Sequence, residues 1–435
     1  MRHLMYIVSS TILTCMFVSI PADGAGMPIS IGGPVVLGYA GTEGDNAVAA
    51  DLNGDGLPDI VQGVDFGSPI VYLNNGTAAP FAGVTGEVIV PGYTQQAGHV
   101  VVADVNGDGH PDIIAGGFDD LTLVYLNNGT SDPFKGVTGR GVGAGVHDDT
   151  LAMDVGDVDG DGLPDLVTGN TNGETNKLYL NNGTSDPFSG VAGVSIGPET
   201  GFISDIKLAD VNGDHKLDVI VSNFDNPGDA GVRIYLNNGT ATPFSGVTPI
   251  FLRNDAGTGV IAVADLDGDG KPDLLVSGGT TGQNWIYLNT GSSSAPFSAA
   301  KELPADPNIK STCFGVTVAD LDGDGHPDAV LGCGVFTGGT SAGAQGAIYL
   351  NNGTADPFAG TVALDLPPTS SLFSRSAQVV RLAKGGSLDL LLGVNAPAYY
   401  PITRGQSQTV GGGGVMGWLS LMALFAGFLA RMKKP

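Results

Sequence analysis

Basic residues are scarce in this chain: 18 Lys and Arg stand against 44 Asp and Glu, and the formal net charge is −26 over 435 residues. A protein that binds nucleic acid or an anionic membrane surface needs a basic patch to neutralise phosphates, so neither is an expected partner. Charged residues make up only 14% of the chain, whereas it contains 70 Gly and 26 Pro. This composition is typical of short β-strands joined by many tight turns.

Recognisable catalytic motifs are also missing. The sequence contains no glycine-framed serine, no paired-histidine motif and no nucleophile placed beside a base. A non-catalytic binding or adhesion module is therefore the first hypothesis. The alternative is a secreted hydrolase or lyase that acts on extracellular polysaccharide, because a fold by itself does not exclude catalysis. A surface structural protein without a specific ligand is the third hypothesis.

Cysteine occurs only three times. Cys15 lies inside an apolar N-terminal run, which leaves Cys313 and Cys333 as the remaining pair. These two residues fall on consecutive expected strands, on either side of one turn. In an oxidising compartment they are candidates for a disulfide, although sequence spacing alone does not establish the required Cα geometry.

Long apolar runs occur only at the two ends of the chain. Residues 1–25 combine Arg2, an apolar stretch from Leu4 to Ile20 and small residues near Gly26, which is the pattern of a secretory signal peptide removed by signal peptidase. Residues 404–414 form a Gly-rich linker, and residues 415–435 form a hydrophobic sorting or anchor segment with a basic end. Its apolar part is shorter than the ~20 residues of an ordinary spanning helix.

The C-terminal stretch GGGGVMGWLSLMALFAGFLARMKK resembles the GlyGly-CTERM sorting signal of Gram-negative bacteria. That resemblance implies cleavage by a rhomboid-type protease, rhombosortase, whereas a plain transmembrane anchor is the alternative. Membrane contact is expected only through this segment. We therefore expect an exported protein, secreted or attached to the surface of a Gram-negative cell.

One phrase, Ala-Asp-x-Asn/Asp-Gly-Asp-Gly-x-Pro-Asp, recurs with little change, and its first Asp falls at Asp51, Asp104, Asp157, Asp210, Asp265 and Asp320. A second phrase, Tyr-Leu-Asn-Asn-Gly-Thr, follows each copy; it begins at Tyr72 in the first repeat and reads Tyr-Leu-Asn-Thr-Gly-Ser in the fifth. A seventh copy between Ala377 and Gly393 keeps the loop length and the final Asp389 but has lost the other acids. This copy is expected to be structural and metal-free.

Each repeat predicts four short antiparallel strands. In the second repeat these are residues 99–104, 112–116, 121–126 and a fourth strand after residues 133–136. Seven such units over residues 29–403 predict an all-β fold, a seven-bladed β-propeller. The last unit supplies only three strands, while the run Ile29–Leu37 precedes the first unit. The N-terminal strand is therefore expected to complete the last blade and to remove two free sheet edges.

The Asp-rich loops have the donor set of a hard cation. Side-chain oxygens at positions 1, 3, 5 and 9 and the backbone carbonyl of position 7 suit Ca²⁺, which accepts six to eight oxygen ligands. About six structural Ca²⁺ ions are expected. The predicted metal-binding residues are Asp51, Asn53, Asp55, Leu57 and Asp59; Asp104, Asn106, Asp108, His110 and Asp112; Asp157, Asp159, Asp161, Leu163 and Asp165; Asp210, Asn212, Asp214, Lys216 and Asp218; Asp265, Asp267, Asp269, Lys271 and Asp273; and Asp320, Asp322, Asp324, His326 and Asp328.

His215 replaces the position-6 glycine of the fourth loop, where the backbone is expected to need a positive φ. The fourth site should therefore be the weakest of the six. A catalytic role for His215 is disfavoured, because it is a single substitution within a repeated structural loop.

The repeated phrases resemble the FG-GAP and VCBS repeats, which are also found in integrin α-subunit propellers. The resemblance covers roughly residues 30–403 and implies a seven-bladed propeller with Ca²⁺ in the loops between first and second strands. The seventh copy departs from the pattern, so no metal is carried over to it. The resemblance also agrees with a binding or adhesion role rather than an enzymatic one.

Strand order places the Asp-rich loops and the Asn-Asn-Gly turns on one face and the more variable connections on the other. Those connections are the expected recognition surface for a glycan or an extracellular protein. Tyr93, His147, Phe202 and Phe224 are the candidate contact residues there. Under the enzyme hypothesis, Asp148 or His147 would be the group whose replacement abolishes activity. The protein is expected to be a monomer.

Overall fold

A computed structural model describes residues 26–37, 44–92, 97–117, 121–143, 148–224, 231–253, 259–278, 283–305, 312–334, 346–367, 376–393 and 397–405. All secondary-structure elements of these residues are β-strands. The described part of the chain contains no helix with the length and apolar character needed to span a bilayer. The predicted signal peptide and C-terminal segment lie outside the described residues.

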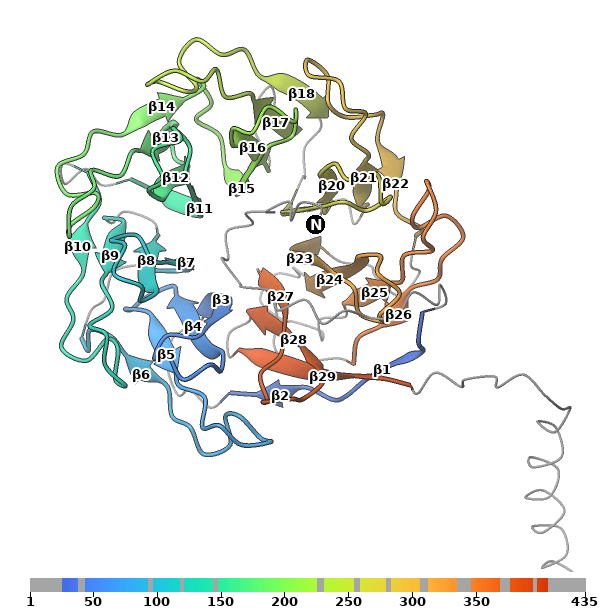
Figure 1. The fold of residues 1–435 in the computed structure, drawn as a ribbon, viewed down its shortest axis with the longest axis horizontal. Coiled ribbons are helices and arrows are strands. Elements are labelled where there is room, and N and C mark those ends of the chain that lie inside the picture. Colours follow the sequence, from blue (N-terminus) through green and yellow to red (C-terminus); the bar gives the residue numbers. More distant parts are fainter. Residues whose placement is uncertain are drawn as a thin grey trace, which may run out of the picture. The chain divides into compact units, whose positions relative to one another are not determined.

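The strands form seven antiparallel sheets arranged around a central axis (Figure 1). The first strands of blades 1 to 7 lie nearest the axis and are β3 (Gly44–Ala50), β7 (His99–Ala103), β11 (Thr150–Gly156), β15 (Ile203–Ala209), β19 (Ile261–Ala264), β23 (Thr312–Ala319) and β27 (Ser376–Val380). The second strands are β4 (Asp59–Val64), β8 (Asp112–Gly116), β12 (Asp165–Asn170), β16 (Asp218–Asn223), β20 (Asp273–Val276), β24 (Asp328–Gly334) and β28 (Leu388–Gly393). The third strands are β5 (Ile70–Tyr72), β9 (Leu123–Tyr125), β13 (Asn176–Tyr179), β17 (Gly231–Tyr235), β21 (Trp285–Tyr287), β25 (Ala347–Tyr349) and β29 (Ala398–Arg404). The fourth strands of blades 1 to 6 are β6 (Glu87–Val88), β10 (Arg140–Gly141), β14 (Val194–Ile196), β18 (Ile250–Arg253), β22 (Lys301–Glu302) and β26 (Leu364–Asp365).

The seventh blade is completed by the N-terminal segment, as predicted. Strands β1 (Ile29–Ile31) and β2 (Val35–Val36) both pair antiparallel with β29. The expected single strand is divided in two because Gly32, Gly33 and Pro34 interrupt it, and proline has no N–H to donate to a ladder. Strand β29 ends at Arg404, so this residue belongs to the last blade and not to the predicted linker.

The predicted strands of blade 2 agree with the structure except at their ends. Strand β8 has the predicted bounds, β7 ends one residue early at Ala103, and β9 is shorter than the predicted 121–126. Asp104 leaves the ladder because its carboxylate accepts N–H groups of the following loop. The seven loops between first and second strands, six of them Asp-rich, lie on what we call the Asp-loop face, and the starts of the first strands lie on the opposite face.

Apolar side chains gather between blades, one cluster at each junction. The cluster between blades 1 and 2 includes Val61 of β4 and Val100 of β7, and the cluster between blades 7 and 1 includes Leu391 of β28 and Ile60 of β4. Five further clusters fill the remaining junctions in the same way. Each blade is therefore stabilised by burying both of its faces against its neighbours, which a single four-stranded sheet cannot do alone.

Candidate metal loops and the opposite face

All thirty predicted metal-binding residues are described by the structure: those at positions 1 to 7 lie in the loops, and each position-9 aspartate is the first residue of a second strand. The six loops share one hydrogen-bond pattern. In the first loop Asp51 accepts the N–H of Gly54 through Oδ1 and the N–H of Gly56 through Oδ2, both at 2.8 Å. Asn53 accepts the N–H of Asp55, and Asp55 accepts that of Leu57. These bonds turn the loop tightly and bring the oxygens of positions 1, 3 and 5 together.

Three loops satisfy a distance test for a shared cation. Two oxygens bound to one Ca²⁺ at about 2.4 Å can lie at most about 4.8 Å apart. One carboxylate oxygen from each of three aspartates meets this limit in the following loops: Asp157, Asp159 and Asp165; Asp265, Asp267 and Asp269; and Asp320, Asp322 and Asp328. These oxygen-only donor sets fit Ca²⁺.

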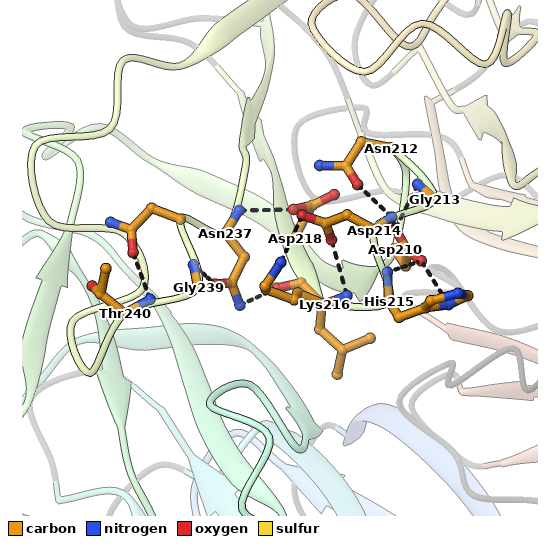
Figure 2. A network of polar contacts seen from close by, with 12 residues as sticks. Asp210, Asn212, Gly213, Asp214, His215, Lys216, Asp218, Asn237, Gly239 and Thr240 are labelled. Atoms are coloured by element: carbon orange, nitrogen blue, oxygen red, sulfur yellow. Dashed lines mark hydrogen bonds and ion pairs between the residues drawn. The ribbon is translucent and has the colours of Figure 1, made fainter.

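The fourth loop has the predicted backbone irregularity. His215 has φ of 67°, in the left-handed region that glycine occupies at the same position of other loops, such as Gly56 with φ of 84°. Its N–H still donates to Asp210 Oδ2 at 2.8 Å, so the loop keeps its shape (Figure 2). A non-glycine residue in this region is strained by about 1 kcal/mol or more, which supports the prediction that the fourth site is the weakest.

The position-9 aspartates have a second role within the fold. Asp112 is fully buried and accepts two backbone N–H groups, from Val105 at 3.1 Å and from Asn127 at 2.8 Å. The equivalent aspartates of the other five loops make the same two contacts. Burial, together with the nearby carboxylates of Asp108 and Asp104, raises the pKa of Asp112 to about 7. A bound cation would offset both effects.

The first Asn of each Tyr-Leu-Asn phrase joins neighbouring blades. Asn127 donates from Nδ2 to the carbonyl oxygen of Leu52 in blade 1 at 2.8 Å, and its own N–H donates to Asp112. Figure 2 shows the corresponding Asn237 bonded to Asp218. The same inter-blade bond recurs in the pairs Asn74–Leu382, Asn181–Val105, Asn237–Val158, Asn289–Val211 and Asn351–Leu266. The sequence had indicated only a turn at these asparagines.

An arginine takes the place of this asparagine at the last junction. Arg404 of blade 7 donates from Nε to the carbonyl oxygen of Leu321 and from Nη2 to that of Asp320, each at 2.6 Å. Leu321 occupies the loop position of blade 6 that Leu52 occupies in blade 1. Every junction of the ring therefore has a side chain bonded to the preceding blade's loop, and sequence analysis missed the one supplied by Arg404.

The seventh loop contains a basic side chain in place of its first aspartate. Arg381 stands at position 1, where the other loops have Asp, and its Nη1 donates to the carbonyl oxygen of Gly386 at 2.9 Å. Asp389 keeps the position-9 bond to the N–H of Leu382. A guanidinium at this position would repel a metal ion, which agrees with the metal-free loop predicted from the sequence.

In the absence of calcium, stability should fall as the pH rises. Burial raises the pKa of the position-9 aspartates to about 6 or 7 and does the same for Asp154 of β11, to about 7. A folded-state pKa above the unfolded value of about 3.9 gives stability that is complete below pH ~4 and is lost as pH rises through 6 to 7. Thermal melting in chelator should show a higher Tm at pH 5.5 than at pH 8. A Tm that rises between pH 5.5 and pH 8 would contradict the raised pKa values of these buried aspartates.

Three phenylalanines meet on the opposite face. Phe202 precedes β15 and Phe224 follows β16, both in blade 4, and their ring centroids are 6.0 Å apart. Phe224 also contacts Phe314 of β23 in blade 6, at 5.7 Å. Phe202 is 38% exposed. The sequence predicted Phe202 and Phe224 as separate contact residues, whereas Phe314 was missed because only ring closure brings blade 6 to blade 4.

Cys313 and Cys333 form the predicted disulfide. They are directly opposite each other in the β23–β24 ladder, and both are buried. Cys313 immediately precedes Phe314, so the bridge ties together the ends of β23 and β24 that lie beside the aromatic cluster.

Asp148 belongs to a buried polar contact rather than to an open site. It accepts hydrogen bonds from Lys177 and from the Tyr179 hydroxyl, and it is 3% exposed. Blade 4 has a parallel arrangement, in which Glu199 pairs with Arg233 at 3.3 Å. Lys177 and Arg233 each stand two residues before the tyrosine of the repeat. This recurrence favours a structural role for Asp148. His147 and Tyr93 lie outside the described residues.

Comparison with known proteins supports the repeat assignment. The family model described as FG-GAP-like repeat matches residues 51–115, 104–168, 157–221, 210–276 and 275–331. Integrin alpha-6 of Gallus gallus is 28% identical over 146 residues, which cover 31% of this chain and 14% of the integrin. Integrin alpha-7 of Homo sapiens is 32% identical over 143 residues, which cover 29% of this chain and 12% of the integrin. The match thus spans only a small part of each curated relative.

Solved structures share the fold at low sequence identity. A crystal structure of BBS1N in complex with ARL6DN has a TM-score of 0.51 and 12% identity, and covers 88% of this chain and 99% of that one. The extracellular domain of the hybrid two-component system BT4673 from B. thetaiotaomicron has a TM-score of 0.51 and 14% identity, with coverage of 88% and 42%. These likenesses concern the fold alone.

Proposed function

Because the chain belongs to the FG-GAP-like repeat family, we propose that it is an exported, calcium-loaded adhesion or binding module whose partner is an extracellular protein. The likeness to two integrin α chains supports a role outside the cell. In this proposal residues 1–25 are a signal peptide that directs export. The proposal also includes surface attachment or release through the C-terminal segment 415–435, cleaved by a rhomboid-type protease in a Gram-negative bacterium.

Calcium in this proposal has a structural role. The thirty loop residues would hold about six ions, and each ion would neutralise the carboxylates that crowd one loop. The observation that supports this is the convergence of carboxylate oxygens within 4.8 Å in three loops, each on a rigid turn between two strands. The ions lie on the Asp-loop face, away from the aromatic cluster.

The observation that carries the recognition role is the cluster of Phe202, Phe224 and Phe314. Three adjacent aromatic rings on one face of a rigid scaffold offer contact area with little loss of side-chain entropy, which is the character of a binding hot spot. A protein partner is favoured over a glycan by the integrin likeness.

The role is tested by presenting the purified protein, with calcium, to arrays of extracellular proteins and of glycans. A Phe202→Ser/Phe224→Ser double variant should lose protein binding by tenfold or more. Phe66→Ser is the matched control, because Phe66 is a 59% exposed phenylalanine in blade 1 and does not belong to the cluster. Binding to glycans alone would overturn the protein partner, and the absence of binding on both arrays would overturn the recognition role.

A further inference from the structure

The six Asp-rich loops differ in whether a side-chain cation already contacts one of their carboxylates. In the fourth loop, Lys216 Nζ lies 3.0 Å from Asp214 Oδ2. In the fifth loop, Lys271 makes the same contact with Asp269. Both lysines stand at position 7 and both aspartates at position 5, so the ammonium group occupies an oxygen that the cation would need.

A basic side chain at the end of the last blade contacts the sixth loop. Arg404 Nη2 lies 3.6 Å from Asp320 Oδ1, in addition to its two bonds to loop carbonyls. The N–H of Met27 donates to the Asp322 carbonyl at 3.2 Å, and Asp322 is only 4% exposed. Residues from both ends of the ring therefore cover this loop.

The first three loops have no such contact. Among the residues that the structure describes, no lysine or arginine forms an ion pair with a carboxylate of loops 1, 2 or 3. Their position-7 residues are Leu57, His110 and Leu163. The third loop combines four aspartates with no neighbouring cation, which makes it the most favourable of the six.

We propose that the loops form two classes of calcium site: a tighter class in blades 1 to 3, whose carboxylates pair with no described lysine or arginine, and a weaker class in blades 4 to 6. In loops 5 and 6 the neighbouring Lys271 and Arg404 outweigh the advantage of a fourth aspartate and of three converging carboxylates. This proposal rests on the calcium binding proposed above. Calcium entering a weak site must displace an ammonium or guanidinium group from a ligand carboxylate and then remains next to that charge. Because these ion pairs are partly exposed and screened, the expected difference in affinity is about 3- to 10-fold.

The weaker class coincides with the aromatic cluster. Phe202 and Phe224 belong to blade 4 and Phe314 to blade 6, so all three stand on blades of the weaker class. At intermediate calcium concentrations, blades 1 to 3 would be loaded while blades 4 to 6 would not. The order of the recognition face would then depend on calcium concentration over the range in which the weaker sites fill.

The lysines can be replaced without disturbing the turn on which they pack. The Lys216 stem lies against Gly239 and that of Lys271 against Gly291, just as Leu57 lies against Gly76 in blade 1. Leucine is therefore a natural occupant of position 7. The test uses the Lys216→Leu/Lys271→Leu double variant, with Lys135→Leu as control, because Lys135 pairs with Asp132 on the surface and touches no metal loop. Arg404 is left unchanged because it also links blade 7 to blade 6.

Calcium titration of the full-length protein by calorimetry should show about three tight and three weak sites. The double variant should gain a tight site at loop 5 and should also bind calcium more strongly at loop 4, where the strained turn at His215 remains. Lys135→Leu should behave as the wild type. Hydrogen exchange at intermediate calcium should protect loops 1 to 3 before loops 4 to 6. Six equivalent sites, or a double variant that matches the wild type, would overturn the two classes while leaving calcium binding intact. The absence of binding heat would overturn the proposed calcium function itself.

Discussion

Asp165→Ala is expected to lower the free energy of unfolding by about 2 to 4 kcal/mol even when calcium is absent. The reason is that Asp165 Oδ2 accepts the N–H of Val158 at 2.9 Å and Oδ1 accepts that of Asn181 at 2.8 Å. Val158 and Asn181 are both buried, and alanine would leave their N–H groups without a partner. Burying the Asp165 carboxylate is itself unfavourable, because burial raises its pKa to about 6. Alanine removes this cost, which offsets part of the expected destabilisation.

Asp161→Ala is the matched comparison within the same loop. Asp161 occupies position 5, is exposed, and accepts only the N–H of Leu163 at 2.9 Å. Its removal should weaken calcium binding but should change stability in chelator by less than about 0.5 kcal/mol. Denaturant unfolding of both variants, with and without calcium, separates the two roles. Equal effects of both variants in chelator would show that Asp165 acts only as a metal ligand.

Removal of calcium is the second large effect that we expect. Six sites with dissociation constants of about 10⁻⁴ to 10⁻³ M, in about 2 mM calcium, together stabilise the folded state by about 4 to 10 kcal/mol. For a ring of this length, that corresponds to a decrease in Tm of about 5 to 13 °C when chelator is added. The physical cause is the mutual repulsion of the loop carboxylates, which no solvent cation then offsets.

Differential scanning calorimetry with chelator, followed by added calcium, measures this effect. Magnesium at the same concentration should restore little of the Tm, because it requires near-ideal octahedral geometry and retains its water. An unchanged Tm in chelator would contradict structural calcium. The Asp-poor seventh loop serves as an internal control, since hydrogen exchange around Arg381 and Gly386 should not respond to calcium.

Local patterns were sufficient to predict the blades. The spacing of the Asp-rich phrase, the Asn-Gly turns and the alternation of the strands predicted the repeat, the strand order and the number of blades. The missing fourth strand of the seventh unit predicted that the run Ile29–Leu37 would complete the last blade. The pairing of Cys313 with Cys333 could also be predicted, because both lie on one hairpin. All of these features depend on neighbours within one repeat or on counting repeats.

The sequence by itself therefore determined the propeller, its six acidic loops and the Asp-poor seventh copy, because each of these is encoded within a single repeat of the chain. Tertiary structure alone decided which side chains link the blades and which basic side chains contact the loop carboxylates. The bond from Asn74 to Leu382 and the contact between Arg404 and Asp320 join residues more than eighty positions apart in the sequence. Phe314 reaches Phe224 for the same reason. Such contacts form only when whole blades pack against one another, or, for Asn74 and Leu382, when the ring closes, and neither event leaves a local pattern in the sequence.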